Sequence, residues 1–222
     1  TILWKQGDLP QAAQSFQRAL TIVERSVGSQ HPLVAANLLS LGEINRQMGN
    51  LPTAREMFSQ ALSIQEATLG PQHNDIATTL TRLSWVAGSE KDYSRARTLL
   101  EQAVKIREQA LGETHPDLAI LLNELARVKH RQGQLADARP DYERARQIYL
   151  AVSRLNKDLD DATFSHLHQQ GIASLQDYAL LLAQLSRQVS ERSIVTDGFL
   201  VAEQARGWLV QAAVAKAMAR KQ

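Results

Sequence analysis

Residues 31–72 read HPLVAANLLSLGEINRQMGNLPTAREMFSQALSIQEATLGPQ, and this pattern recurs along most of the chain. The following copies begin at His73 (HNDIATTLTRLSW) and at His115 (HPDLAILLNELAR), a step of 42 residues each time. The same step relates three sets of small or apolar residues: Ala12, Ala54, Ala96 and Ala138; Ala19, Ala61, Ala103 and Ala145; and Ile22, Ile64, Ile106 and Ile148. A period this long predicts stacked supersecondary units, none of which can bury its apolar face alone.

Each 42-residue unit has the pattern of two helices joined by a tight turn. Apolar residues follow helical spacing in both halves of the unit, and the turn between them carries Gly7, Gly49 or Gly133, with Lys91 in the same slot of the third unit. A non-glycine residue forced into the left-handed conformation there should cost about 1 kcal/mol. The predicted helix pairs are 32–48 with 51–69, 74–89 with 93–111, and 116–132 with 135–153.

The two ends of the chain depart from the repeat. Residues 2–6 match only the end of a first helix, so the chain reads as a trimmed or processed piece. After residue 153 the register is lost, because Arg154 stands where Gly should recur. The predicted organisation is an array of one partial and three complete units over 1–153, a linker or short helix over 154–171, and a divergent helical pair over 172–222. In that pair we expect helices over 172–190 and from Phe199 to about 219, with a turn over 193–198.

Composition narrows the possible functions. The chain has 25 basic and 23 acidic residues and no dense basic block, which argues against a nucleic-acid partner. It has no cysteine, which excludes disulfides, thiolate nucleophiles and cysteine-based metal sites. No apolar run reaches the roughly 18–20 residues that span a bilayer, so no membrane partner is expected. We find no phosphate-binding loop, dinucleotide glycine motif, HExxH or GxSxG. We therefore expect no catalytic residues, no cofactor, no enzyme activity and a cytoplasmic location.

The histidines do not predict a metal site. His31, His73 and His115 occupy equivalent positions in successive units, too far apart to share an ion, and are expected to cap or pack at a helix start. His166 and His168 are two residues apart, and this spacing directs side chains to different sides of a helix.

The repeat resembles a known family. Leu41-Gly42, Gly49, Ala54, Phe58 and Ala61-Leu62 look like the tetratricopeptide repeat (TPR) pattern. The 42-residue length, the His-Pro at the unit start and the ALSIQEATLG and AVKIREQALG endings resemble the long variant found in kinesin light chains and many bacterial proteins. The resemblance covers about residues 1–153. It implies an all-α, right-handed superhelical solenoid of antiparallel helix pairs that binds a peptide or protein segment in its concave groove.

By position in the family pattern, the groove-facing residues come from the first helix of each pair. They are Trp4, Lys5, Leu39, Glu43, Arg46, Gln47, Thr81, Trp85, Ser89, Asn123, Arg127, His130 and Arg131. In kinesin light chains a pair of asparagines on this helix holds the peptide, and only Asn123 matches such a position here. What remains is one aromatic side chain and several arginines. Because arginine can hold a carboxylate and tryptophan can anchor an apolar side chain, we expect an acidic or carboxylate-bearing segment with an apolar anchor.

The last helix suggests two alternative functions. The run FLVAEQARGWLVQAAVAKAMAR, residues 199–220, resembles the helix that precedes the caspase-like CHAT domain of bacterial TPR–CHAT proteins. That resemblance implies a sensor or regulatory region of a larger protein, with the protease beyond Gln222. The helix is also apolar around much of its circumference, which is typical of an interface. As a self-assembly module, the chain would form a homodimer through Val201, Ala205, Trp208, Leu209 and Ala212.

Overall fold

The computed structural model describes residues 9–155, 161–189 and 192–219, and of these the side chains of 153–155, 161–167 and 211–219 are not described. All regular secondary structure in these ranges is α-helical. The predicted all-α class is therefore confirmed. The contacts divide the chain into two compact units, Thr1–Gly112 and Glu113–Gln222, which are called unit 1 and unit 2.

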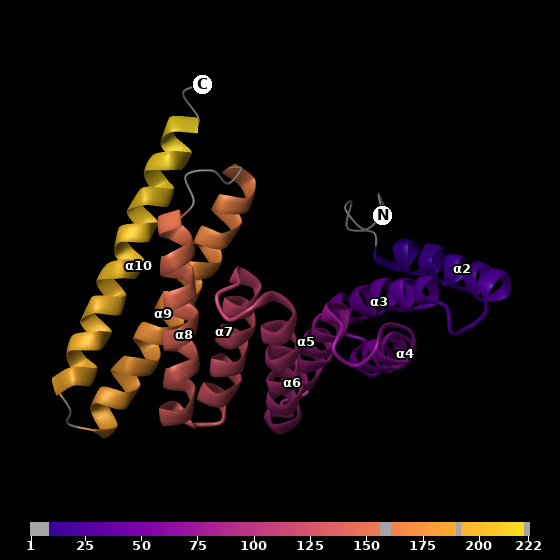
Figure 1. The fold of residues 1–222 in the computed structure, drawn as a ribbon, viewed down its shortest axis with the longest axis horizontal. Coiled ribbons are helices and arrows are strands. Elements are labelled where there is room, and N and C mark those ends of the chain that lie inside the picture. Colours follow the sequence, from indigo (N-terminus) through magenta and orange to yellow (C-terminus); the bar gives the residue numbers. More distant parts are fainter. Residues whose placement is uncertain (1–8, 156–160, 190–191, 220–222) are drawn as a thin grey trace. The chain divides into compact units, whose positions relative to one another are not determined.

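The described part of unit 1 consists of two helical hairpins preceded by one further helix. This further helix is α2 (Leu9–Val27), and the hairpins pair α3 (Pro32–Gln47) with α4 (Leu51–Leu69) and α5 (Asn74–Ser89) with α6 (Tyr93–Leu111). Helix α2 also packs on α3, and α4 packs on α5, so α2 and α4 each contact the first helix of the next hairpin (Figure 1). These bounds agree with the predicted helices to within one residue.

Unit 2 has the same hairpin arrangement. Helix α7 (Pro116–Arg131) pairs with α8 (Leu135–Leu155), and α9 (Asp161–Gln188) pairs with α10 (Arg192–Ala219). Helix α9 packs on both α7 and α8, so α8, α9 and α10 lie next to one another (Figure 1). Within unit 2 the second hairpin therefore stacks on the first.

The C-terminal hairpin differs from the prediction in two places. Residues 161–171, expected as a linker or short helix, form the first turns of the 28-residue helix α9. The turn expected over 193–198 was wrong, because α10 already begins at Arg192. Gly198 suggested a break, but Ile194 is buried in the unit 2 core and fixes this segment as helix. Burial of one apolar side chain outweighs the roughly 1 kcal/mol that a glycine costs inside a helix.

The recurrent histidines cap helices. The Nδ1 atoms of His31, His73 and His115 each accept a hydrogen bond from the backbone N–H two residues later, all at 3.2 Å. Each histidine has extended backbone angles and stands immediately before α3, α5 or α7. An imidazole nitrogen thus takes the role that Ser, Thr or Asp usually has at the start of a helix. This confirms the prediction that these residues start helices.

The turn inside each hairpin needs a left-handed residue. Gly49 and Gly133 have φ values of 81° and 77°, and Lys91 adopts φ 64° in the equivalent turn. Lys91 is the one non-glycine residue with positive φ in the described part of the chain. The predicted strain at this slot is therefore present in the structure.

Lys91→Gly is expected to stabilise unit 1 by up to about 1 kcal/mol. The substitution removes the clash between Cβ and the backbone, although the more flexible unfolded chain offsets part of the gain. Urea unfolding followed by circular dichroism would measure the change. Lys91→Ala is the control, because it removes the ammonium group but keeps the Cβ, and it should give no comparable gain.

The core of each hairpin includes the recurrent alanine near the start of its second helix and a larger residue four positions later. Ala54, Ala96 and Ala138 are all buried, and so are the larger residues four positions later: Phe58, Leu100 and Tyr142. In unit 2 the Tyr142 ring stacks on Tyr178 of α9, with centroids 5.6 Å apart. The same repeat position thus contributes a large side chain to the core of both units.

Candidate protein-binding surfaces

Helices α3 and α5 lie side by side in unit 1 and present a cluster of charged and aromatic side chains. Arg46 donates two hydrogen bonds to the Glu43 carboxylate, at 2.6 and 3.0 Å, and Gln47 donates a third at 3.0 Å. The Arg46 guanidinium also lies over the Trp85 ring, 5.8 Å from its centroid. Trp85 remains 39% exposed. We call Glu43, Arg46, Arg82 and Trp85 the α3–α5 cluster.

The charges of the α3–α5 cluster do not balance. Burial alone would raise the pKa of the Glu43 carboxyl, but the hydrogen bonds from Arg46 and Gln47 lower it below its ordinary value. Burial lowers the pKa of Arg82, and the Glu43 charge opposes that shift. Because the starting value for arginine is so high, both guanidinium groups keep their charge at neutral pH. Two cations therefore share one carboxylate, which leaves this surface with one excess positive charge.

The other predicted groove residues of unit 1 have mainly structural contacts. Thr81 is buried and donates to the carbonyl of Ala77, and Ser89 donates to the carbonyl of Trp85. Leu39 is partly buried between two core clusters. Trp4 and Lys5 lie outside the described residues. Among the predicted groove residues of unit 1, Trp85 and Arg46 are therefore the ones whose side chains are accessible to a ligand and able to bind its apolar or acidic groups.

On the equivalent surface of unit 2 the charges balance, because Arg127 and Arg131 are matched by Glu124 and Asp177. Arg127 pairs with Glu124 at 3.0 Å and with Asp177 of α9 at 3.5 Å, so one cation here serves two carboxylates. His130 contacts the Gln184 amide oxygen at 2.8 Å, and Arg131 is exposed. Asn123 is buried, and its Oδ1 has no hydrogen-bond partner among the described residues. An acidic ligand is less favoured here than at the α3–α5 cluster.

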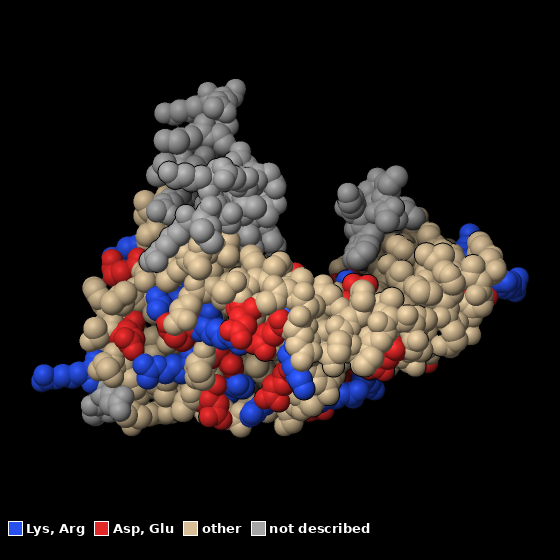
Figure 2. Space-filling model, in the orientation of Figure 1, with Lys and Arg blue, Asp and Glu red and all other residues tan. Residues whose placement is uncertain are grey.

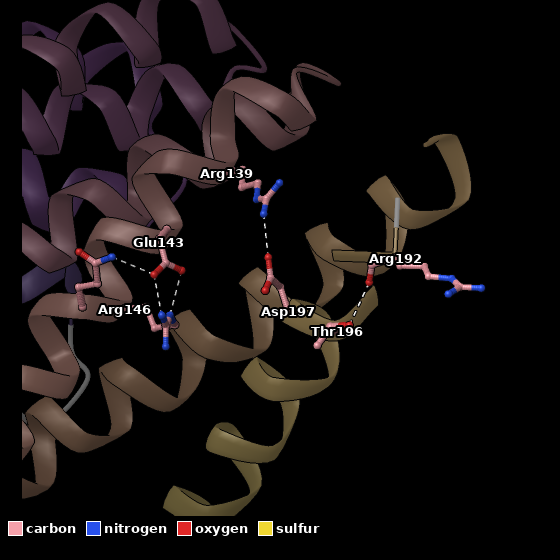
Figure 3. A network of polar contacts seen from close by, with 7 residues as sticks. Arg139, Glu143, Arg146, Arg192, Thr196 and Asp197 are labelled. Atoms are coloured by element: carbon pink, nitrogen blue, oxygen red, sulfur yellow. Dashed lines mark hydrogen bonds and ion pairs between the residues drawn. The ribbon is translucent and has the colours of Figure 1, made fainter. Parts of the chain in front are cut away.

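A pocket of about 220 Å³ lies between α8, α9 and α10, and the sequence reasoning did not anticipate it. Its lining consists of Arg139, Glu143, Arg146, Tyr178, Asp197, Leu200 and Val201. Arg139 bridges from α8 to Asp197 of α10 at 2.8 Å, and Arg146 holds the Glu143 carboxylate at 2.6 Å (Figure 3). Burial raises the pKa of Tyr178, and the Glu143 charge adds to this shift, so the phenol stays neutral.

Ion pairs in the pocket neutralise one another. Arg146 also donates to the Gln204 amide of α10 at 3.0 Å, and so links the two helices a second time. Figure 2 shows the same mixture on a larger scale, with basic and acidic groups interspersed on the described surface in view. A motif search could not find this pocket, because its residues come from three helices with no shared sequence pattern.

The predicted interface residues of the last helix differ in burial, because some face the unit 2 core and others face solvent. Val201 and Ala205 are 3% and 5% exposed and pack in the unit 2 core. Trp208 is half-buried, and its ring stacks on His168 of α9 at 4.7 Å. Leu209 is 46% exposed, and the side chain of Ala212 is outside the described set. Val201 and Ala205 are therefore corrected from interface to core positions, because α9 already covers them.

The described residues contain no group of three or more His, Asp or Glu side chains that could hold a metal ion. Of the helices that are described, none is both long and apolar enough to cross a membrane.

Sequence comparison identifies the repeats. The sequence model of the tetratricopeptide repeat matches residues 1–67, 35–109 and 89–151, which together cover more than half of the chain. The chain belongs to the tetratricopeptide repeat family. No curated protein matches its sequence.

Solved structures support the same fold. One similar crystal structure contains the nearly identical TPR-like repeats of a Podosopora anserina protein assigned as a kinesin light chain. Its sequence is 22% identical to this chain, and the TM-score is 0.72. That match covers 94% of this TPR chain and 90% of the other. BtubC (BKLC) from P. vanneervenii is 19% identical with a TM-score of 0.66, and the match covers 92% and 77% of the two chains. At these identities the likeness establishes the fold, a TPR solenoid, and leaves the ligand open.

Proposed function

We propose that this TPR protein is a non-catalytic interaction scaffold that binds a segment of another protein at the α3–α5 cluster. The observation that carries the proposal is the half-exposed Trp85 ring with the Arg46 guanidinium above it. Tryptophan and arginine are the residues most enriched among those that dominate binding energy at interfaces. The TPR fold itself supports a role in protein–protein interaction.

The charge of the cluster favours an acidic ligand. Arg46 and Arg82 share the single carboxylate of Glu43, so an incoming carboxylate would restore neutrality. A ligand that also presents an apolar side chain could cover the exposed Trp85 ring. We therefore propose a segment that carries Asp, Glu or a C-terminal carboxylate next to an apolar residue. The equivalent surface of unit 2 favours this ligand less, since Arg127 and Arg131 are already matched there by Glu124 and Asp177.

Selection from a displayed library of random peptides would test this proposal. We expect the wild-type protein to enrich sequences with an acidic group beside an apolar residue. Trp85→Ala should weaken the selected peptides by about 30-fold or more, which is the scale of an interface residue worth about 2 kcal/mol. Arg46→Ala should reduce the preference for the acidic group. Fluorescence polarisation with synthetic peptides would measure both effects.

Two control variants match these substitutions. Ile22→Ala removes a large exposed apolar side chain on α2, and Arg97→Ala removes an arginine that pairs with Glu101 on α6. Both should bind the selected peptides like the wild type. Equal binding by Trp85→Ala and wild type would rule out the α3–α5 cluster as the site.

Regulation of an attached caspase-like effector is the alternative, and it rests on the resemblance of residues 199–220 to the helix before CHAT domains. A reading frame that continues past Gln222 into a domain with a catalytic His and Cys would support this alternative.

A further inference from the structure

One face of α10 carries a regular stripe of exposed residues, apolar at its two ends and charged at its centre. Phe199 and Val210 are 71% and 58% exposed, and Glu203 and Arg206 lie between them. These four residues follow successive steps of four, three and four, which is the spacing of the contact positions in a coiled coil. We call them the α10 stripe.

No described part of the chain covers the α10 stripe. The opposite side of the helix carries Ile194, Val201 and Ala205, which are buried in the unit 2 core. Val195 and Leu209, 60% and 46% exposed, widen one flank of the stripe. Exposed apolar side chains grouped in this way on one helix face usually mark an interface.

The order of residues in the stripe is symmetric about its centre. Phe199 and Val210 are equally distant from the point between Gln204 and Ala205, and Glu203 and Arg206 are equally distant from the same point. If two copies of α10 lie antiparallel about this point, Phe199 of each copy faces Val210 of the other. Glu203 of each copy then faces Arg206 of the other, so both charge pairs are complementary.

We infer that α10 pairs with α10 of a second copy of this chain, antiparallel, in a two-fold symmetric homodimer. A parallel pair in register would place Glu203 against Glu203 and Arg206 against Arg206, and like charges in contact oppose binding. In the single chain Glu203 and Arg206 pair with each other at 3.0 Å, with 45% and 75% of their side chains exposed. A pair this exposed contributes little, so its exchange for pairs between copies costs little. The polar centre specifies the register, and the apolar ends supply contact area.

This inference is independent of peptide binding at the α3–α5 cluster, and mass measurement tests it. Sedimentation equilibrium of the full 222-residue chain should give a mass that rises from one to two copies with concentration. Glu203→Arg and Arg206→Glu should each remain monomeric, since each makes both inter-copy charge pairs repulsive. The double swap Glu203→Arg/Arg206→Glu should restore the dimer.

Mixing the two single variants gives the sharpest test. Glu203→Arg and Arg206→Glu fail to pair with themselves, but a heterodimer of the two has complementary charges at both positions. We expect the mixture to dimerise although each component alone does not. If the mixture stays monomeric while the wild type dimerises, the antiparallel register is wrong.

An engineered disulfide distinguishes antiparallel from parallel pairing of the two α10 helices. Within one copy, residues 199 and 210 are 11 positions apart, about 16 Å along a helix, too far for a disulfide. Phe199→Cys/Val210→Cys should therefore oxidise to a covalent dimer, whereas Phe199→Cys alone should not. The natural chain has no cysteine to interfere. A wild-type mass of one copy at every concentration would overturn the proposal, as would efficient cross-linking of Phe199→Cys alone.

Discussion

Phe58→Ala is expected to lower the free energy of unfolding of unit 1 by about 3–5 kcal/mol. Phe58 is fully buried between α4 and α5, where Ala54, Leu83 and Val86 complete its cluster. Truncation removes the whole ring and leaves a cavity where α4 packs on α5. Urea unfolding followed by circular dichroism would measure the loss, with Ile22→Ala on α2 as a control, because Ile22 is 65% exposed.

The ring of Phe58 also explains why residue 42 is glycine. A Cβ at Gly42 would lie 2.5 Å from Cε1 of Phe58, closer than real contacts allow. Gly42→Ala should therefore destabilise the unit by about 1–3 kcal/mol, because the ring has no space to move. The later repeats have Ser84 with Leu100 and Ala126 with Tyr142 at the equivalent positions. Neither of these repeats has phenylalanine at the position of Phe58, and neither has glycine at the position of Gly42.

A double-mutant cycle tests this coupling. Gly42→Ser combined with Phe58→Leu reproduces the pair that α5 and α6 use, and it should cost less than the sum of the two single changes. Additive losses would show that the ring and the glycine do not share the space that the structure gives them.

The repeats made the helices of the three complete 42-residue units predictable. Every copy of the 42-residue unit repeats the same small, apolar and turn positions, so a helix or turn predicted in one copy is supported by the equivalent residues of the others. Lys91 illustrates this, because its left-handed conformation follows from the glycines at 49 and 133 rather than from its own residue type. The start of each first helix was predictable for the same reason, from the recurrent histidines.

The charged contacts and the last hairpin were not predictable in the same way. Glu43 and Arg46 are near in sequence, but the contact of Arg46 with Trp85 depends on the packing of α3 beside α5. The ion pair between Arg127 and Asp177 joins helices 50 positions apart. In α10 the apolar residues cover so much of the surface that periodicity alone could not separate the buried Val201 from the exposed Phe199.

Gly171→Ala is expected to destabilise unit 2 by about 1–3 kcal/mol. Gly171 is buried in α9, and a Cβ there would overlap the ring of Trp208 on α10. The ring is also held by stacking on His168, whose Nε2 contacts the Trp208 carbonyl oxygen at 3.0 Å. The added methyl group must push the ring out of this site or separate the two helices, and either change reduces packing between α9 and α10.

Gly207→Ala is the matched control for this prediction. Gly207 is an exposed glycine inside α10, and a Cβ there meets nothing within 4 Å. The same chemical change should therefore stabilise the helix by about 0.5–1 kcal/mol, because alanine restricts the unfolded chain and favours the helix. The same substitution is thus expected to lower the free energy of unfolding at Gly171 and to raise it at Gly207. A general effect on solubility or expression would not produce opposite changes at the two positions.

Tryptophan fluorescence distinguishes the mechanism from a general loss of stability. The chain has three tryptophans, so Trp4→Phe/Trp85→Phe leaves Trp208 as the single reporter. In this background Gly171→Ala should shift the Trp208 emission to longer wavelength in the folded state, because the displaced ring becomes more exposed, whereas Gly207→Ala should leave it unchanged. An unchanged spectrum and stability for Gly171→Ala would mean that Trp208 does not occupy the space beside Gly171. The contact between α9 and α10 described here would then be wrong.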